Sequence, residues 1–132
     1  MRQLSLILLL FFSTSLFAGQ DTYNCVVKDV REVSDKGMFF KPSGLMSYQI
    51  GMNFIIKKRT GEVVGEYVNS DYADTLDVLD KGGNSNNFKT LSTYGPERQI
   101  LYIEVVDSSS HKSAPFAFIG FRLSSTFSGT CK

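Results

Sequence analysis

The chain has 132 residues, with 14 Lys and Arg against 13 Asp and Glu and a single His. This length suits one small domain and excludes a multidomain enzyme, and the nearly balanced charge lacks the concentrated positive charge that nucleic-acid binding requires. Hydrophobic residues make up 42% and aromatic residues 13% of the sequence, enough to fill a core and to exclude global disorder.

The first 18 residues have the pattern of an export signal. Met1 and Arg2 give a positive start, residues 4–12 form an apolar stretch, and small residues lead to Ala18, after which we expect cleavage. The apolar stretch is about half the roughly 20 residues that a membrane-spanning helix needs, which disfavours the alternative of a retained anchor. Loss of Arg2 with the signal leaves equal numbers of basic and acidic residues.

The sequence thus predicts a signal peptide over residues 1–18 and a single domain over 19–132. It favours a protein that is periplasmic or secreted, without stable membrane insertion after cleavage and without a nucleic-acid partner. A short signal and the lack of an Asn-x-Ser/Thr sequon are typical of a bacterial origin.

About eight segments of the mature region alternate apolar and polar residues, as strands with one buried face do. In chain order they cover residues 23–28, 52–58, 63–68, 75–79, 88–94, 100–106, 115–123 and 125–131. A short apolar piece, Met38–Phe40, stands alone between two turn signals. No window has a convincing helical period, so we expect an all-β domain.

Two of these segments can be placed further. Gly61 supplies the positive φ that a tight turn requires, so 52–58 and 63–68 are expected to form a hairpin. The stretch 100–106 is dense in β-branched and aromatic residues, which favours a central strand.

Cys25 and Cys131 are the only cysteines and lie near the two ends of the mature region, 106 positions apart. In an oxidising compartment we expect a structural disulfide that ties the first strand to the last. Closing a loop of about 100 residues stabilises a fold by about 4.7 kcal/mol through the entropy of the unfolded chain. The alternative, a reactive thiol pair, usually has the close Cys-x-x-Cys spacing.

Many short strands joined by turns predict an antiparallel meander, and the disulfide between its ends favours closure into a small β-barrel. A β-sandwich is the alternative, because alternation shows only that one face of each strand is buried. The expected strands are shorter than the roughly 9 to 11 residues of membrane-crossing strands, which disfavours an outer-membrane barrel.

Residues that could carry chemistry are few. His111 is the sole histidine, so we expect no multi-histidine metal site. Because the sequence has no recognisable catalytic set or cofactor-binding motif, we expect neither a cofactor nor enzymatic activity. Ser109–Lys112 matches the Ser-x-x-Lys pattern of some acyl-enzymes, but it lies in a Ser-rich stretch without a helical context. Four aspartates recur every third position over 71–80. We interpret them as a solvated acidic edge, because in a strand this spacing puts successive carboxylates on alternate faces. Calcium binding is the alternative.

The 11 Phe and 6 Tyr are the most suggestive feature of the composition. Either they fill the core of a domain that has no Trp, or some of them form an exposed binding surface. In the segment 115–123 the two-residue period puts the first two Phe on one face and Phe121 on the other. The candidate surface residues are Tyr67, Tyr94, Tyr102, Phe116 and Phe118.

Several short motifs together resemble a family of small exported proteobacterial proteins, a resemblance that implies no particular activity or site residue. The motifs are Tyr23–Cys25, Phe54 with Arg59–Gly65, Val78–Gly82 before Phe88–Lys89, and Phe127–Cys131. The layout alone is also similar to that of the periplasmic inhibitors of C-type lysozyme, which are small β-barrels with a disulfide joining strands near both ends.

We therefore expect an exported, non-enzymatic β-barrel binding module that holds a small apolar or envelope-derived ligand. The alternative is a protein-binding module, such as an inhibitor of an envelope-attacking enzyme, that uses exposed loops. A hydrolase is the third and least favoured class. A lined cavity would favour the first reading and a filled interior with an exposed aromatic patch the second; the oligomeric state is left open.

Overall fold

The computed structural model describes residues 21–83, 86–97, 99–106, 116–122 and 125–132. Within these residues the chain forms nine strands and one short 3-10 helix. Their bounds are β1 (Thr22–Val33), β2 (Phe39–Phe40), η1 (Gly44–Gln49), β3 (Asn53–Lys57), β4 (Val63–Gly65), β5 (Thr75–Lys81), β6 (Phe88–Tyr94), β7 (Gln99–Val105), β8 (Phe116–Arg122) and β9 (Ser125–Cys131).

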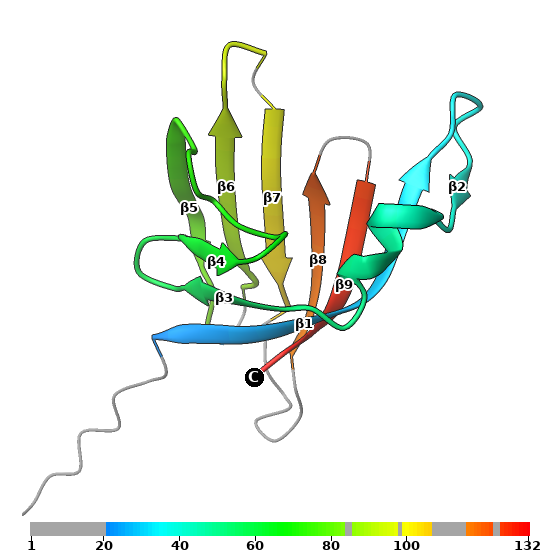
Figure 1. Cartoon of the computed structure of the whole chain (residues 1–132). Coiled ribbons are helices and arrows are strands. Elements are labelled where there is room, and N and C mark those ends of the chain that lie inside the picture. Colours follow the sequence, from blue (N-terminus) through cyan, green and yellow to red (C-terminus); the bar gives the residue numbers. More distant parts are fainter. Residues whose placement is uncertain (1–20, 84–85, 98, 107–115, 123–124) are drawn as a thin grey trace, which may run out of the picture.

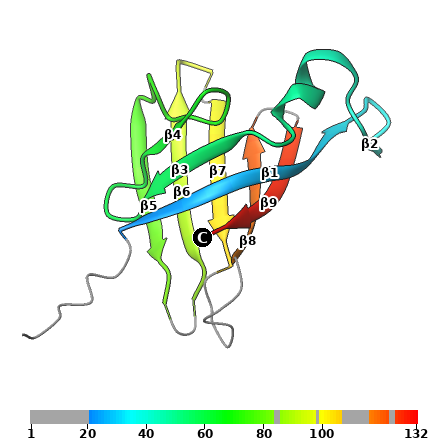
Figure 2. The ribbon, with the colours of Figure 1, turned by 60° about the horizontal axis from the view of Figure 1, so that its bottom comes forward.

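Eight of these strands form one antiparallel sheet in the order β4-β3-β1-β9-β8-β7-β6-β5, and β2 pairs with β1 beside this path. The sheet curls into a half-barrel, in which β1, β3 and β4 cross in front of β5, β6 and β7 (Figures 1 and 2). The predicted all-β antiparallel meander of about eight strands is confirmed. No hydrogen-bonded ladder between β4 and β5 is found in the described part of the chain, so we call the gap between these two edge strands the seam.

The disulfide predicted between Cys25 and Cys131 is present. The two cysteines face each other in the β1–β9 ladder and are both buried. The first and the last strand are therefore neighbours at the centre of the sheet. A disulfide of this kind indicates a non-cytoplasmic protein, because cytosolic thiols are usually kept reduced.

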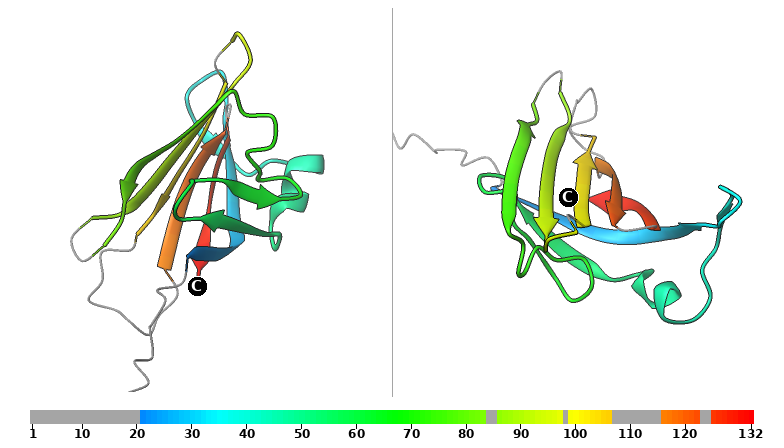
Figure 3. Two further views of the ribbon diagram at one scale, coloured as in Figure 1. Left: turned by 90° about the vertical axis from the view of Figure 1, so that its left-hand side faces the viewer. Right: turned by 90° about the horizontal axis from the view of Figure 1, so that it is seen from above.

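A bulge divides β1 into two parts. The ladder with β9 shifts register between Val27 and Asp29, so the inward-facing positions change from Cys25 and Val27 to Val30. An extra residue of this kind bends a strand and increases its twist. Both parts of β1 pair with β9, and the end of the second part continues outward to β2 (Figure 3).

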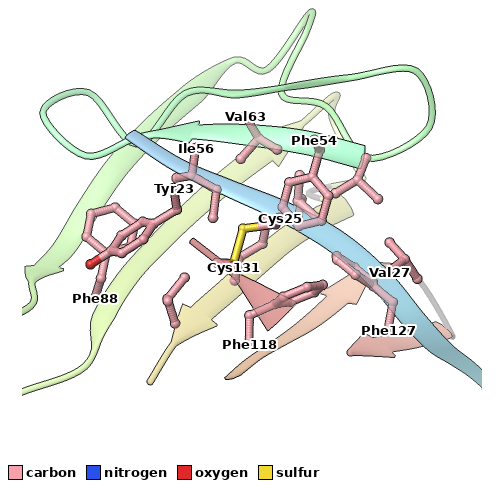
Figure 4. Packing of buried hydrophobic residues seen from close by; sticks show 14 of the residues in the cluster. Tyr23, Cys25, Val27, Phe54, Ile56, Val63, Phe88, Phe118, Phe127 and Cys131 are labelled. Atoms are coloured by element: carbon pink, nitrogen blue, oxygen red, sulfur yellow. A yellow bond between two sulfur atoms is a disulfide. The ribbon is translucent and has the colours of Figure 1, made fainter. Parts of the chain in front are cut away.

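The core fills the space between the two halves of the curled sheet (Figure 4). The Phe54 ring meets that of Phe118 at 5.1 Å between centroids and that of Phe127 at 6.3 Å, and Tyr23 meets Phe88 at 5.4 Å. Aromatic rings from both halves thus occupy the interior. Each buried aromatic side chain contributes roughly 1.5–3 kcal/mol by leaving water.

The seam is bridged by side chains and loops. Gly61 lies in the turn between β3 and β4 with φ +75°, as predicted, and its carbonyl accepts a hydrogen bond of 3.0 Å from Thr90 Oγ1 on β6. Ser70, in the connection to β5, binds Val63 through both its backbone N–H and its hydroxyl. Tyr94 Oη donates to the Asn69 carbonyl at 2.9 Å. These contacts fasten the β3–β4 turn to β6, and the β4–β5 connection to β4 and β6.

The described residues contain no helix that is long and apolar enough to cross a membrane.

Candidate binding surface

A projecting segment, which we call the apolar arm, comprises residues 31–50. It contains the end of β1, the β2 strand and η1, and it extends away from the half-barrel (Figures 1 and 3). Among residues 31–53, no side chain that the structure describes belongs to the buried core. The arm is therefore built on the fold without contributing to its interior.

Backbone hydrogen bonds give the arm a defined shape. Gly37, at φ +73°, donates its N–H to the Ser34 carbonyl at 2.9 Å, and Ser34 and Met38 exchange two further bonds. At the base, Gly51 N–H donates to the Val27 carbonyl and Val27 N–H to the Met52 carbonyl. The arm is thus an ordered hairpin with a fixed base.

Large apolar side chains of the arm are exposed. Met38 is 67%, Phe39 64% and Tyr48 65% accessible, and Phe40, Val33 and Ile50 are also exposed. Burying one Phe or Met side chain stabilises a fold by roughly 1.5–3 kcal/mol, so these exposed side chains do not contribute that hydrophobic stabilisation to the folded chain. Several large apolar side chains exposed on one projecting segment typically mark an interaction surface.

The charges of the arm are unevenly distributed. Exposed Lys36 and Lys41 lie on either side of residues 37–40, and no Asp or Glu occurs from position 36 to position 61. At the base, Arg31 Nε donates to Asp29 Oδ2 at 2.7 Å, and this hydrogen bond lowers the pKa of the Asp29 carboxyl, with Lys41 adding to the effect. Residues 36–50 of the arm are consequently apolar and cationic.

The described residues among those suggested from the sequence as a binding surface lie in different environments. Phe118 is 3% exposed and lies in the core against Phe54, while the side chain of Phe116 lies outside the described residues. Tyr94 packs against the core at the seam. Tyr67 is exposed in the β4–β5 connection.

Tyr102 lies on the outer face of β7, opposite Phe121 of β8 at 6.1 Å between ring centroids. Its hydroxyl donates to Glu104 Oε2 at 2.9 Å, and Asn87 Nδ2 donates to Glu104 Oε1 at 2.6 Å. Burial, then the hydrogen bond to Glu104, raises the pKa of Tyr102 to about 12. The hydrogen bond from Asn87, followed by that from Tyr102, lowers the pKa of Glu104.

A groove of about 440 Å³ lies on the outer side of β1, β3 and β9. It combines apolar side chains with amides and a hydroxyl, a composition suited to a small ligand with few polar groups. Its lining residues are Asn24, Cys25, Val26, Asn53, Phe54, Ile55, Thr130 and Lys132.

Of the residues that the sequence suggested for catalysis or metal binding, some lie outside the described residues and Asp80 contacts a turn. His111 and Ser109–Lys112 are outside the described residues. Asp80 Oδ1 accepts the N–H of Gly82 at 3.1 Å in the turn after β5. Within the part of the chain that the structure describes, no three His, Cys, Asp or Glu side chains group as metal ligands.

Comparisons with protein-family models, with curated proteins and with solved structures found no match to the chain.

The arm is the feature that sequence reasoning did not single out. Met38–Phe40 stands out in the sequence as an isolated apolar piece between turn signals. Its flanking lysines, at positions 36 and 41, are the signal that could have indicated an exposed surface, since core strands rarely carry charge at both ends of so short a stretch.

Proposed function

We propose that the chain is an exported, non-enzymatic binding module of the bacterial periplasm or exterior, and that it engages a component of the cell envelope through the apolar arm. The observation that carries this proposal is the exposure of Met38, Phe39, Phe40 and Tyr48 on a projection that the core does not need.

The packing of the interior supports binding at the surface. The space between the two halves of the sheet holds the fully buried rings of Tyr23, Phe54, Phe88 and Phe127. Such a barrel is filled by its own side chains, whereas a carrier encloses room for its cargo. Met and aromatic residues are enriched at binding interfaces, because they offer much apolar area.

Site-specific photo-cross-linking in intact cells tests this function. With Phe39→p-benzoylphenylalanine we expect a specific adduct with an envelope component, whereas the same substitution at Ile100, an exposed position on β7, should give none. The adduct should also disappear when Met38→Ser and Phe40→Ser are added. Equal labelling at both positions, or none at position 39, would contradict the proposal.

A second candidate function, carriage of a small apolar or envelope-derived ligand, is favoured by the groove beside β1 and β3, where Val26 and Ile55 supply apolar surface. Native mass spectrometry of protein purified gently from its host tests it. Carriage predicts a defined added mass that is lost in an Ile55→Lys variant, and a mass equal to the polypeptide alone would argue against it.

A further inference from the structure

We propose that the partner of the apolar arm is the surface of a lipid bilayer bearing anionic phospholipid headgroups, into which the side chains of Met38–Phe40 insert at interfacial depth. The proposal rests on the function proposed above and names the envelope component. Three observations carry it: the apolar side chains on both faces of the hairpin, the position of its charges and the open edge of β2.

Each face of the hairpin carries one exposed Phe, with Val33 beside Phe39 and Glu32 beside Phe40 in the ladder. Adjacent residues of a strand project to opposite faces, so the two Phe side chains point in opposite directions, and both are exposed. A protein pocket is complementary to one face of such a hairpin, whereas a bilayer interface surrounds the projection. The two-sided exposure therefore favours lipid over protein.

The charges suit an anionic headgroup layer. Lys36 and Lys41 flank the apolar residues, and a lysine stem can lie along apolar surface while its ammonium group reaches headgroup phosphates. From Lys36 to the end of the arm at residue 50 the sequence carries no carboxylate. Glu32 and Asp35, which precede Lys36, restrict the arm to a depth at which carboxylates remain hydrated.

The backbone edge of β2 that faces away from β1 also restricts the arm to the depth of the headgroup layer. In the described residues β2 pairs only with β1, so its other edge presents backbone N–H and C=O groups. Such groups need water or headgroup partners, because the hydrocarbon core offers none. The docking we infer is thus peripheral and reversible, as for a segment that lies in the interface.

The chain has no Trp, which provides a sharp test. In the exported form, with its N-terminus established by mass, Phe39→Trp introduces a single fluorescent reporter. We expect a blue shift with vesicles of phosphatidylcholine and phosphatidylglycerol, a much weaker one with phosphatidylcholine alone, and quenching by lipids brominated near the headgroup. Leu79→Trp, exposed on β5, is the matched control and should not respond.

Variants separate the two contributions in a vesicle flotation assay. Phe39→Ser with Phe40→Ser should reduce partitioning by at least about tenfold, because two rings no longer leave water. Lys36→Gln with Lys41→Gln should reduce it by about fivefold per lysine, and added salt should have a similar effect. Leu79→Ser with Ile100→Ser serves as the apolar control and Lys81→Gln as the charge control; neither should change partitioning.

The outcomes distinguish failure of this inference from failure of the proposed function. Vesicle binding that needs both the arm and anionic lipid supports the inference. Binding that the arm variants leave unchanged, or that is equal on phosphatidylcholine alone, would overturn it. If vesicles do not bind but Phe39→p-benzoylphenylalanine captures a protein in cells, the lipid inference fails and the proposed function stands. If neither occurs, both fail.

Discussion

Individual side chains on the outer face of the sheet form a small polar network of their own. Glu104 accepts hydrogen bonds from Asn87 and Tyr102, and both stabilise the ionised carboxylate. The Tyr102 ring simultaneously pairs with Phe121 across the strands. Opposed aromatic residues contribute about 0.2–1 kcal/mol to a sheet, so this cluster fastens β6, β7 and β8 from outside.

We predict that Glu104 makes stability depend on pH in the acidic range. Its folded-state pKa lies below the ordinary value of 4.5, so its stabilisation is fully present above about pH 4.5 and is lost as the pH falls through the folded value. Glu104→Gln should cost about 1 kcal/mol near neutral pH, and the difference from the parent should shrink on acidification.

Denaturant unfolding at a series of pH values measures this effect, with exposed Glu97→Gln in the β6–β7 turn as the control. A free-energy difference for Glu104→Gln that stays constant from about pH 7 to about pH 3 would show that the network does not stabilise the carboxylate.

At the scale of elements, the contact of β1 with β9 decides the shape of the molecule. The bulge after Val27 lies beside Gly129, whose backbone passes so close to β1 that a side chain has no room. An added Cβ would overlap the Val26 carbonyl oxygen and would stand 3.0 Å from the Lys28 nitrogen. The glycine therefore permits the bend that directs the second part of β1 outward into the arm.

Gly129→Ala should consequently destabilise the fold by about 1–3 kcal/mol, because the β1 backbone and the buried Phe118 ring would have to move. Thermal or denaturant unfolding checks this value. Ser128→Ala, one residue away in the same strand, should change stability by no more than about 0.5 kcal/mol. Equal stability of Gly129→Ala and the parent would mean that β1 and β9 leave room for a side chain at position 129.

Elements also differ in how far the sequence determines them. β6 and β9 match the expected segments 88–94 and 125–131, and the β3–β4 hairpin was predicted from Gly61, because alternation and turn chemistry are local signals. The extension of β1 to Val33 and the short η1 were not predicted. The bulge interrupts the two-residue period, and η1 has too few residues for a helical period to be visible.

The candidate surface was harder to predict than the fold. Alternation assigned Phe118 and Phe121 to opposite faces, and the structure places Phe118 in the core and Phe121 outside. Which face is covered depends on the curl of the whole sheet. The sequence of a single strand does not determine how the strands pair across that sheet. Exposure of Phe39 and Phe40 likewise depends on the arm extending past the core.

In the whole molecule, the disulfide and the seam lie at different places in the sheet and in the chain. The disulfide joins strands at the centre of the sheet, whereas the open seam lies between strands that follow each other in the chain. The loop that it closes spans 106 positions, and a loop of about 100 residues corresponds to about 4.7 kcal/mol of constraint on the unfolded chain.

Loss of the disulfide should accordingly lower the free energy of unfolding by about 2–5 kcal/mol. We expect this for Cys25→Ala combined with Cys131→Ala, measured by denaturant unfolding, and a similar loss for the reduced parent protein. In the untreated parent, intact mass should show the two-hydrogen deficit. If both thiols can be alkylated after unfolding without reductant, the covalent link is absent in the exported protein.

The position of the seam has a consequence for chain connectivity. Since β9 ends beside the start of β1, a short linker could join them, and new termini could be opened in the β4–β5 connection. The strand order of such a circular permutant would be β5-β6-β7-β8-β9-β1-β3-β4. Each strand of this path would then follow its neighbour in the sheet along the chain as well. In the natural chain the two ends lie at the β9–β1 step of this meander, and the Cys25–Cys131 disulfide supplies the covalent link between these two strands.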